Sequence, residues 1–282
     1  MSPAAWALAR VAGVENPEQA MHLLVAQLLE EAEQTSPPTN LPLVASFQNI
    51  AGVDEATVLG AALIVRMGTA FRVVVNRDDT RERQRFSVAH EICHTLFPHF
   101  LGVTALADAD IGVFSKTSEE EWLCDIGASH LLLPPGLVHE AALAMPHDIQ
   151  GLARIAGTFG ASLEATAIAL AGLNVWPCGV VVFEEAGDIA DATVQDEQPS
   201  LRTQAVCLPA ALKRRFFIPL KRPVRTDGPI YGALSVGGPT QGVEVIDTAK
   251  GPARFRTTAL CQSFTHNAVL RRRVVAVVHP LE

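Results

Sequence analysis

Hydrophobic positions in the first fifty residues follow helical spacing. Asn16 followed by Pro17 is a strong helix start, because Asn accepts hydrogen bonds from the first helical N–H groups and Pro suits the first helical position. The helix is predicted to run to about Gln34, with an apolar face formed by Met21, Leu24, Leu28 and Leu29. A Ser-Pro-Pro-Thr run then breaks it, and a second, short helix is predicted over residues 42–50.

The pattern then changes to that of strands. Residues 58–66 and 71–76 are rich in branched apolar side chains and are joined by a Gly-containing turn, which predicts a β-hairpin. An edge strand of such a hairpin can hold the backbone of an extended peptide by strand addition. The alternative is that the hairpin only covers the hydrophobic core, and the sequence favours neither role.

Two longer helices follow the hairpin. Residues 80–97 carry apolar side chains at helical spacing and end before Pro98. Residues 118–133 form the second helix, which the following Pro-Pro pair stops. Between the two helices, residues 99–117 contain glycines and scattered acidic residues, and they predict a loop long enough to be functional.

Residues 148–173 predict two short helices that meet at Gly160-Ala161-Ser162, with Ser162 as the N-cap of the second. This spacing resembles a helix-turn-helix. Duplex DNA binding requires several phosphate contacts from Lys or Arg side chains. Because Arg154 is the only basic residue between positions 136 and 175, we interpret this segment as scaffold or as a docking surface for a protein partner.

Beyond residue 176, short apolar runs alternate with Gly- and Pro-rich turns. The pattern predicts a small mixed or all-β domain of about a hundred residues, within the usual size of domains. The predicted strands are residues 179–184, 205–208, 216–220, 231–236, 254–264 and 273–279.

Composition adds a domain boundary to this picture. The 282 residues are 49% hydrophobic and 18% charged, a globular composition, and no apolar run is long enough to span a bilayer. The net charge of −8 gives no general argument for nucleic-acid binding. Residues 1–175 carry 9 basic and 20 acidic side chains, whereas residues 176–282 carry 13 and 10. The net charge therefore changes from negative to positive near Trp176-Pro177, and we place the domain boundary there.

Cysteine usage and the N-terminal composition predict a cytoplasmic location. Five cysteines, an odd number with no C-x-x-C pair, suit a reducing compartment with free thiols. The opening segment is apolar but lacks a basic leader, so a secretory signal is not expected.

The strongest candidate for chemistry is the H-E-x-x-H run from His90 to His94. Residues four apart on a helix share a face, so these two histidines direct their imidazoles toward one point, and Glu91 projects beside them. Two nitrogen ligands, a third protein ligand and an open position for water form the zinc-peptidase arrangement. The alternative is a buried amphipathic helix with two hydrogen-bonded core histidines, although a buried carboxylate would still need partners.

Glu121 and Asp125 are the candidates for the rest of the site, because they share a face at the start of the next helix. In a zinc site, Glu121 binds the metal and Asp125 accepts a hydrogen bond from the free ring nitrogen of a histidine ligand. The alternative is that Ser118 and Glu121 form a capping box. We favour the ligand role because only Glu121, among three consecutive glutamates, has an Asp four residues later.

Two segments in register, RERQRFSVAHEICHTLF and EEEWLCDIGASHLLLPP, resemble the ImmA/IrrE family of metallopeptidases, and the resemblance covers roughly residues 17–174. Asp125 stands where the family has Asn or Asp. The resemblance assigns metal binding to three residues and the general base to a fourth, namely His90, His94 and Glu121 as ligands and Glu91 as base.

Three departures from the family's pattern leave these ligands unchanged. Cys93 stands where Gly is common, Gly127 where Phe is common, and His130 where an acidic residue is frequent. We expect them to alter packing and substrate fit. Cys93 and Cys124 either make the site sensitive to oxidation or pack as small apolar residues, and the second interpretation is favoured.

The resemblance implies an α+β chain with a zincin-like metallopeptidase core at residues 1–135, a helix-turn-helix-like segment at 136–175 and a small β-rich domain at 176–282. It implies a cytoplasmic zinc-dependent endopeptidase that cleaves a helix-turn-helix transcriptional repressor in a stress response. Manganese is the alternative metal, because sites with two histidines and a glutamate accept more than one. In radiation-response members a GAF-like sensor occupies the place of the last domain, which we expect to sense a signal or to select the substrate.

A non-catalytic function is the alternative hypothesis. In it, a zinc-stabilised fold binds a repressor or nucleic acid through the basic residues of its last domain, grouped at 213–215, 221–225 and 271–273. A solvated strand face is the other interpretation of these residues. Intact Glu91 favours the peptidase, because a purely structural zinc site does not need this carboxylate.

Zinc peptidases often require a side chain that stabilises the developing oxyanion. Four further histidines are candidates for that role, namely His99, His130, His139 and His147. Each is individually more typical of an ordinary surface or packed histidine, because the sequence does not place it relative to the site.

Overall fold

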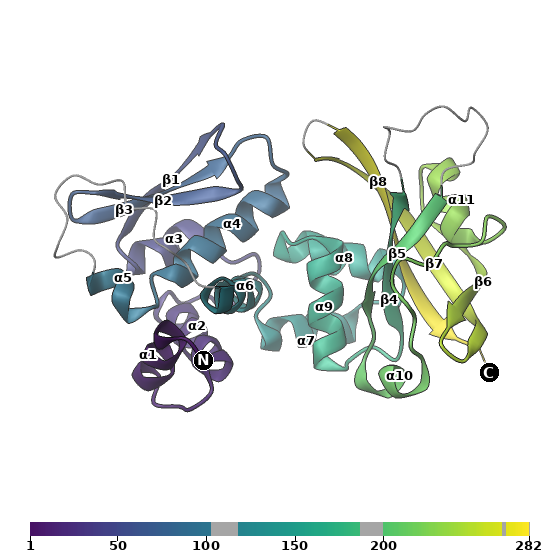
Figure 1. Cartoon of the computed structure of the whole chain (residues 1–282), viewed down its shortest axis with the longest axis horizontal. Helices are drawn as coiled ribbons and strands as arrows, with labels where there is room; N and C mark the ends of the chain where they lie inside the picture. Colours follow the sequence, from purple (N-terminus) through teal and green to yellow (C-terminus); the bar gives the residue numbers. More distant parts are fainter. Residues whose placement is uncertain (103–117, 187–199, 267–268, 282) are drawn as a thin grey trace. The chain divides into compact units, whose positions relative to one another are not determined.

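The computed structural model describes residues 1–102, 118–186, 200–266 and 269–281. In this part of the chain, helices combine with two separate β-sheets (Figure 1), which confirms the predicted α+β class. Most of the loop predicted at residues 99–117 lies outside the described residues. No single helix in the described ranges is long and apolar enough to cross a membrane.

The chain divides into two compact units. The first comprises Met1–Leu137 and Thr158–Ser162, and the second comprises Val138–Gly157 and Leu163–Glu282. The helix-turn-helix-like segment is therefore shared between them, with most of its residues in the second unit. The three-part division drawn from the sequence stays a prediction.

The first unit combines helices with a three-stranded sheet. Its helices are α1 (Pro3–Val11), α2 (Pro17–Glu31), α3 (Leu41–Phe47), α4 (Arg81–His94), α5 (Pro98–Gly102) and α6 (Ser118–Leu132). Its strands are β1 (Ile50–Ala56), β2 (Ala62–Met67) and β3 (Ala70–Asn76), in the order β1-β3-β2. Strand β1 runs parallel to β3, and β2 pairs with β3 antiparallel, as the predicted hairpin requires.

Local sequence explains several of these elements. The Asn16 side chain accepts from the N–H groups of Glu18 and Gln19, so α2 begins where the sequence predicts. In β3, Phe71, Val73 and Val75 are buried and alternate with less buried residues. Helices α3 and α4 lie along one face of the sheet (Figure 1), so the apolar rows of β3 and of the helices share one core.

Strand β1 was not predicted, and it replaces the end of the short helix expected over residues 42–50. Helix α3 stops at Phe47, and Asn49 then adopts a left-handed conformation with φ of 58° that turns the chain into the strand. The strand sequence IAGVDEA lacks an apolar alternation. It forms because it pairs in parallel with β3, a contact between segments distant in sequence.

Helix α4 starts as predicted but ends earlier. Thr80 caps it by accepting from the Arg83 N–H at 3.3 Å. The helix was expected to continue to Phe97, but it ends at His94, and the following residues make the tighter bonds typical of a helix end. The Thr95 hydroxyl donates to the Ile92 carbonyl at 2.6 Å, and the same carbonyl accepts from the Thr95 N–H at 3.1 Å.

After α7 (Pro135–Ala144), helices α8 (Ile149–Phe159) and α9 (Leu163–Leu173) meet at a bend of 104°, which confirms the two predicted helices. Gly160 in the turn has φ of 62°, and its carbonyl accepts from Arg85 Nε of α4 at 3.2 Å. A Cβ at this position would lie 2.8 Å from that nitrogen, so the turn requires glycine.

The second unit is built on an antiparallel sheet in the order β5-β4-β8-β7-β6. The strands are β4 (Gly179–Ala186), β5 (Ser200–Cys207), β6 (Thr240–Thr248), β7 (Gly251–His266) and β8 (Val269–Pro280). One face forms a core with α11 (Pro229–Val236) through residues such as Phe183, Phe255 and Ile230. On the other face, Arg273 of β8 pairs with Glu164 of α9 at 2.8 Å and with Glu184 of β4.

Two of the strands predicted for this unit are wrong. Residues 231–236 belong to helix α11, and residues 216–220 follow the short helix α10 (Ala210–Arg215) without forming a strand. Strand β6 was not predicted. A short apolar run does not distinguish helix from strand. Here the buried Glu244 carboxylate of β6 accepts from the Ile230 N–H at 3.1 Å, so a distant residue stabilises the helix start.

Candidate metal centre

The predicted site residues lie on two helices that contact one another, α4 and α6 (Figure 1). His90 and His94 are one turn apart on α4, and Glu121 lies in the first turn of α6. The His94 side chain is 1% exposed, whereas that of Glu121 is 39% exposed. The cluster is therefore enclosed on the α4 side and open to solvent on the side of Glu121.

Three candidate ligand side chains converge. His90 Nε2 lies 3.1 Å from His94 Nε2 and 3.1 Å from Glu121 Oε2, and His94 Nε2 lies 3.4 Å from Glu121 Oε1. Tetrahedral zinc holds nitrogen and oxygen ligands at about 2.0–2.2 Å, so two such ligands are separated by roughly 3.3 Å. The residues present therefore fit a zinc ion at the separations that its ligands require.

The outer ring nitrogen of each histidine contacts a carboxylate. His90 Nδ1 lies 2.9 Å from Asp125 Oδ1, as the sequence predicts, and His94 Nδ1 lies 3.2 Å from Glu120 Oε1. A carboxylate in this position fixes the proton on Nδ1 and leaves the Nε2 lone pair for a metal. Both histidines thus have the partners that metal-binding histidines require.

Glu120 is a functional candidate that was not predicted from the sequence. Its carboxylate is buried between His94 and His99, with Oε1 3.4 Å from His99 Nε2. The i+4 rule selected Glu121 because Asp125 follows it, and the residue four after Glu120 is Cys124. The run of three consecutive glutamates could have indicated it. Successive residues of a helix point in different directions, so a helix that packs on α4 must bury at least part of such a run.

Cys124 offers a second ligand set. Its sulfur lies 3.3 Å from His94 Nδ1, and His90, His94 and Cys124 form a cluster of potential metal-binding atoms within 4.8 Å of one another. The sulfur approaches the Nδ1 side of the ring, however, whereas the Glu121 carboxylate approaches the Nε2 atoms of both histidines. The geometry therefore favours Glu121 as the third ligand and Cys124 as a neighbour of the His94 ring.

Glu91 follows His90 on α4, and 4% of its surface is exposed. A carboxylate this deeply buried is costly unless polar groups surround it. It is the only carboxylate between the two histidines on α4, and a zinc peptidase requires a carboxylate base next to its histidine ligands.

The departures at Cys93 and Gly127 compensate one another. A Cβ at Gly127 would lie 2.6 Å from Cys93 Sγ and 2.7 Å from Met21 Sδ, so the cysteine occupies space that a larger residue at position 127 would need. Cys93 is fully buried, and burial raises the pKa of its thiol far above the ordinary value. It therefore packs as an apolar residue, as favoured from the sequence.

We expect Gly127→Ala to destabilise the protein by about 1–3 kcal/mol, the usual cost of overpacking a core. Adding Cys93→Gly should recover part of this loss, so that the two changes are not additive in urea denaturation. Gly157→Ala is the matched control, because it lies in α8 with no atom within 4 Å of the new Cβ. Additive effects at positions 93 and 127 would contradict this account.

The other candidate histidines have different surroundings. His130 stacks on His22 of α2, with ring centroids 3.9 Å apart, and burial together with the neighbouring His22 lowers the pKa of His130 to about 4. His139 lies on α7, and the His147 carbonyl accepts a hydrogen bond from His279 Nε2 at 2.6 Å. His99 contacts Glu120 on the Nδ1 side of His94. An oxyanion role for any of them stays a prediction.

Comparison with known proteins gives one family match and one similar fold. Residues 60–171, which include both helices of the cluster, match the sequence model of a family described as the IrrE N-terminal-like domain. No curated protein matches the chain. A solved structure of a Mycobacterium tuberculosis transcriptional regulator aligns with 93% of this chain and 76% of that one, at 11% identity and a TM-score of 0.56. At this identity the similarity concerns the fold alone.

Proposed function

We propose that the chain is a zinc-dependent endopeptidase that cleaves a helix-turn-helix transcriptional repressor. The match of residues 60–171 to the model of the IrrE N-terminal-like domain supports this proposal, in line with the resemblance to the ImmA/IrrE metallopeptidases. The observation that supports this best is the convergence of the Nε2 atoms of His90 and His94 on the Glu121 carboxylate. Glu91, the residue after His90 on α4, would supply the base that a purely structural site does not need.

In this mechanism, His90, His94 and Glu121 hold zinc, with manganese as the alternative metal. When bound, the metal supplies a Lewis acid for the scissile carbonyl and lowers the pKa of a water molecule. Glu91 takes a proton from the attacking water and returns it to the leaving nitrogen. Asp125 keeps the His90 ring in the orientation that this chemistry requires.

We propose that the substrate backbone adds to strand β2. This strand lies at the edge of the three-stranded sheet, pairs with β3 on one side, and contacts α4, which carries the two histidines. Strand addition binds an extended peptide through main-chain hydrogen bonds and therefore suits a peptidase. The alternative from the sequence, a hairpin that only covers the core, would leave β2 without contact to substrate.

We propose a repressor as the substrate on the basis of the family resemblance, and a cytoplasmic location on the basis of the cysteines. All five cysteines are free thiols, and four of them are buried. Free thiols persist in a reducing compartment. A DNA-binding repressor in the same compartment would link the peptidase to transcription regulation and to a stress response.

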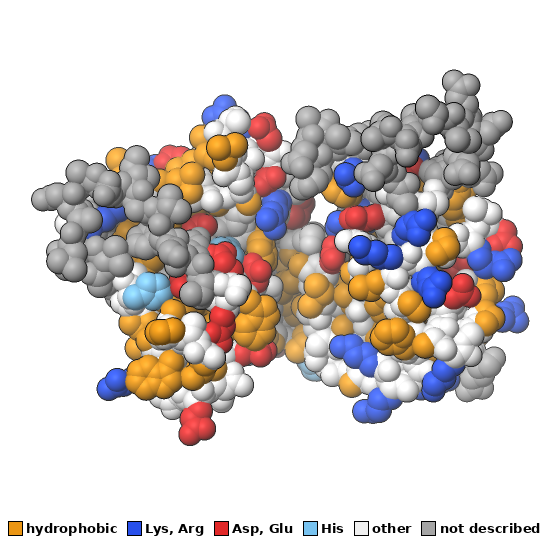
Figure 2. All heavy atoms as spheres, viewed as in Figure 1, with side chains coloured by type: hydrophobic (Ala, Val, Ile, Leu, Met, Phe, Trp, Pro, Cys, Tyr) orange, Lys and Arg blue, Asp and Glu red, His pale blue; other side chains and the backbone are white. Residues whose placement is uncertain are grey.

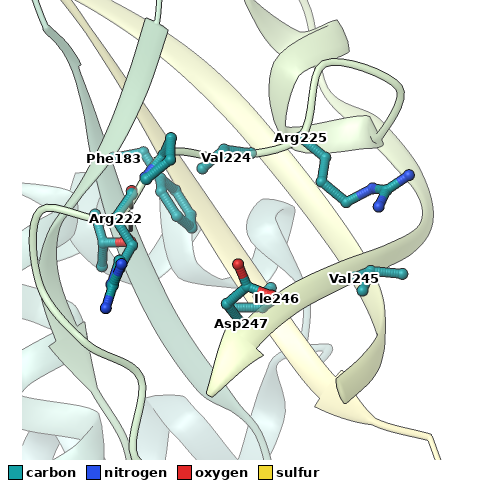
Figure 3. Close-up of a pocket in the computed structure, with 9 residues that line it drawn as sticks. Phe183, Arg222, Val224, Arg225, Val245, Ile246 and Asp247 are labelled. Atoms are coloured by element: carbon teal, nitrogen blue, oxygen red, sulfur yellow. Dashed lines mark hydrogen bonds between the residues drawn. The ribbon is translucent and has the colours of Figure 1, made fainter. Parts of the chain in front are cut away.

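The second unit would then sense a signal or select the substrate. It contains an open groove of about 780 Å³ that is lined in part by His147, Arg256 and His279. This volume is within the range of small-molecule sites, about 300–1,000 Å³. A hollow between Phe183, Val224 and Ile246 (Figure 3) holds only about 20 Å³, room for one water. The groove is therefore the place where we expect a signalling ligand.

The basic residues of the second unit favour the alternative function, a non-catalytic regulator that binds a repressor or nucleic acid. Of the three basic groups in the sequence, the one at 271–273 is largely neutralised, because Arg272 pairs with Glu185 and Arg273 with Glu184 and Glu164. Lys213, Arg214 and Arg215 are exposed, and Lys and Arg side chains gather around α10 (Figure 2). These residues would bind an anionic partner in this alternative.

Metal removal tests the proposal. We expect the metal-loaded protein to create new N-termini in one or two DNA-binding repressors of a cell lysate. The chelator-treated protein should create none, and restored zinc should recover the cuts. The measurement is a comparison of protein N-termini across the three samples. Identical N-termini in all three would contradict the peptidase and favour the non-catalytic alternative.

A further inference from the structure

Glu120 of α6 is a buried carboxylate that the proposed mechanism does not use. Its side chain is 6% exposed, although its neighbours Glu119 and Glu121 in the same run are more accessible. One oxygen, Oε1, lies 3.2 Å from His94 Nδ1 and 3.4 Å from His99 Nε2 of α5. Residues of three helices, α4, α5 and α6, therefore meet at this carboxylate.

The contact with Glu120 determines which ring nitrogen of His94 carries the proton. A neutral histidine carries one ring proton, so His94 presents the Nε2 lone pair to a metal only when Nδ1 holds the proton. A carboxylate at Nδ1 accepts that proton in a hydrogen bond and fixes both tautomer and ring orientation. The Cys124 sulfur, 3.3 Å from the same nitrogen, is a weaker acceptor than a carboxylate.

Burial distinguishes Glu120 from the equivalent partner of His90. The Asp125 side chain is 57% exposed, so water competes for its contact with His90 Nδ1. The contact between Glu120 and His94 is enclosed, where a hydrogen bond to a charged acceptor is stronger than it is in water. His94 is therefore held more rigidly than His90.

We propose that Glu120 is a positioning residue of the metal centre. Its buried carboxylate holds His94 with Nε2 directed at His90 and Glu121, and His99 fixes that carboxylate from the side of α5. This inference rests on the proposed function only in requiring that the His90, His94 and Glu121 cluster binds a metal.

Zinc affinity, measured on the full chain by competition with a chelator, tests this inference. Glu120→Gln keeps the size of the side chain but removes its charge, and we expect it to weaken zinc binding by about 10–100-fold. The matched control is Glu119→Gln, one residue away on the same helix, whose carboxylate accepts from the Ser2 backbone N–H. We expect this control to bind zinc as the wild type does.

A second readout reports the tautomer itself. The ¹⁵N chemical shifts of the His94 ring should place the proton on Nδ1 in the zinc-free wild type and show a mixture of tautomers in Glu120→Gln. A residue that only stabilises the fold would not change these shifts. If Glu120→Gln does not fold, His99→Gln tests the positioning role in its place. His99 is partly exposed, so the variant should fold, and loss of its contact with Glu120 should weaken zinc binding severalfold.

The outcomes separate this inference from the proposed function. Wild-type zinc affinity in Glu120→Gln, or in His99→Gln when the first variant does not fold, would overturn the positioning role while leaving the peptidase intact. A wild-type chain that binds no zinc would overturn both. Weakened zinc binding in Glu120→Gln together with a shifted tautomer supports the role.

Discussion

Replacing Glu91 with Gln is expected to lower the rate of repressor cleavage by about 10²–10⁴-fold, the usual contribution of a general base, while zinc content stays at the wild-type level. Gln has the shape of Glu but does not accept a proton at neutral pH. Since Glu91 is not one of the three converging ligands, its replacement should leave metal affinity unchanged. Cleavage of the repressor by purified protein and metal analysis of the same sample measure the two quantities together.

Glu82→Gln is the control for this prediction. Glu82 lies in the first turn of α4 and is exposed, so its replacement removes the same charge from the same helix without touching the cluster. We expect cleavage at the wild-type rate. A Glu91→Gln protein that retains zinc and cuts at the wild-type rate would exclude the proposed mechanism. Retained regulatory function without cleavage would favour the non-catalytic alternative.

The second large effect is expected from Glu121→Ala, which should weaken zinc binding by more than about 100-fold. Replacing a residue that hydrogen-bonds to a metal ligand already lowers metal affinity by about 10–100-fold, and replacing a direct ligand lowers it more. Cys124→Ala should change affinity by less than about tenfold, because its sulfur contacts His94 Nδ1 and not the Nε2 atoms that face Glu121. Chelator competition on both variants measures the difference.

The opposite ranking would identify the ligands as His90, His94 and Cys124. Absorption spectroscopy of the cobalt-substituted protein identifies the third ligand independently. A thiolate ligand produces charge-transfer absorption in the near ultraviolet, whereas two imidazoles and a carboxylate do not. Such a band in the wild-type protein that disappears in Cys124→Ala would contradict Glu121 as the third ligand.

The proximity of the candidate ligands was predictable from the sequence as far as residues lie within one helix. His90 and His94 share a face of α4, and Glu121 and Asp125 share a face of α6, because helical geometry places residues four apart together. Glu120 and Cys124 were not assigned to His94. Their contacts depend on how α6 is rotated against α4, and no periodicity within either helix specifies that rotation.

The same distinction holds for the fold. Helices α2 and α4 begin where predicted, at the caps Asn16 and Thr80, because capping is a local interaction between a side chain and the next N–H groups. Of these two caps, the sequence identified Asn16. Strand β1 and helix α11 were not predicted from the sequence. The first exists through parallel pairing with β3, and the second starts where Glu244 of β6 accepts from its backbone.

The sequence by itself therefore determined the motif and the helices that carry it, because each depends on neighbours within a few residues along the chain. The tertiary structure alone decided which nitrogen of each histidine faces the Glu121 carboxylate, which carboxylate holds His94, and why Cys93 accompanies Gly127. These features arise from packing between helices. Side chains that are distant in sequence come into close contact there, and the dense packing of the interior admits few alternative arrangements of their atoms.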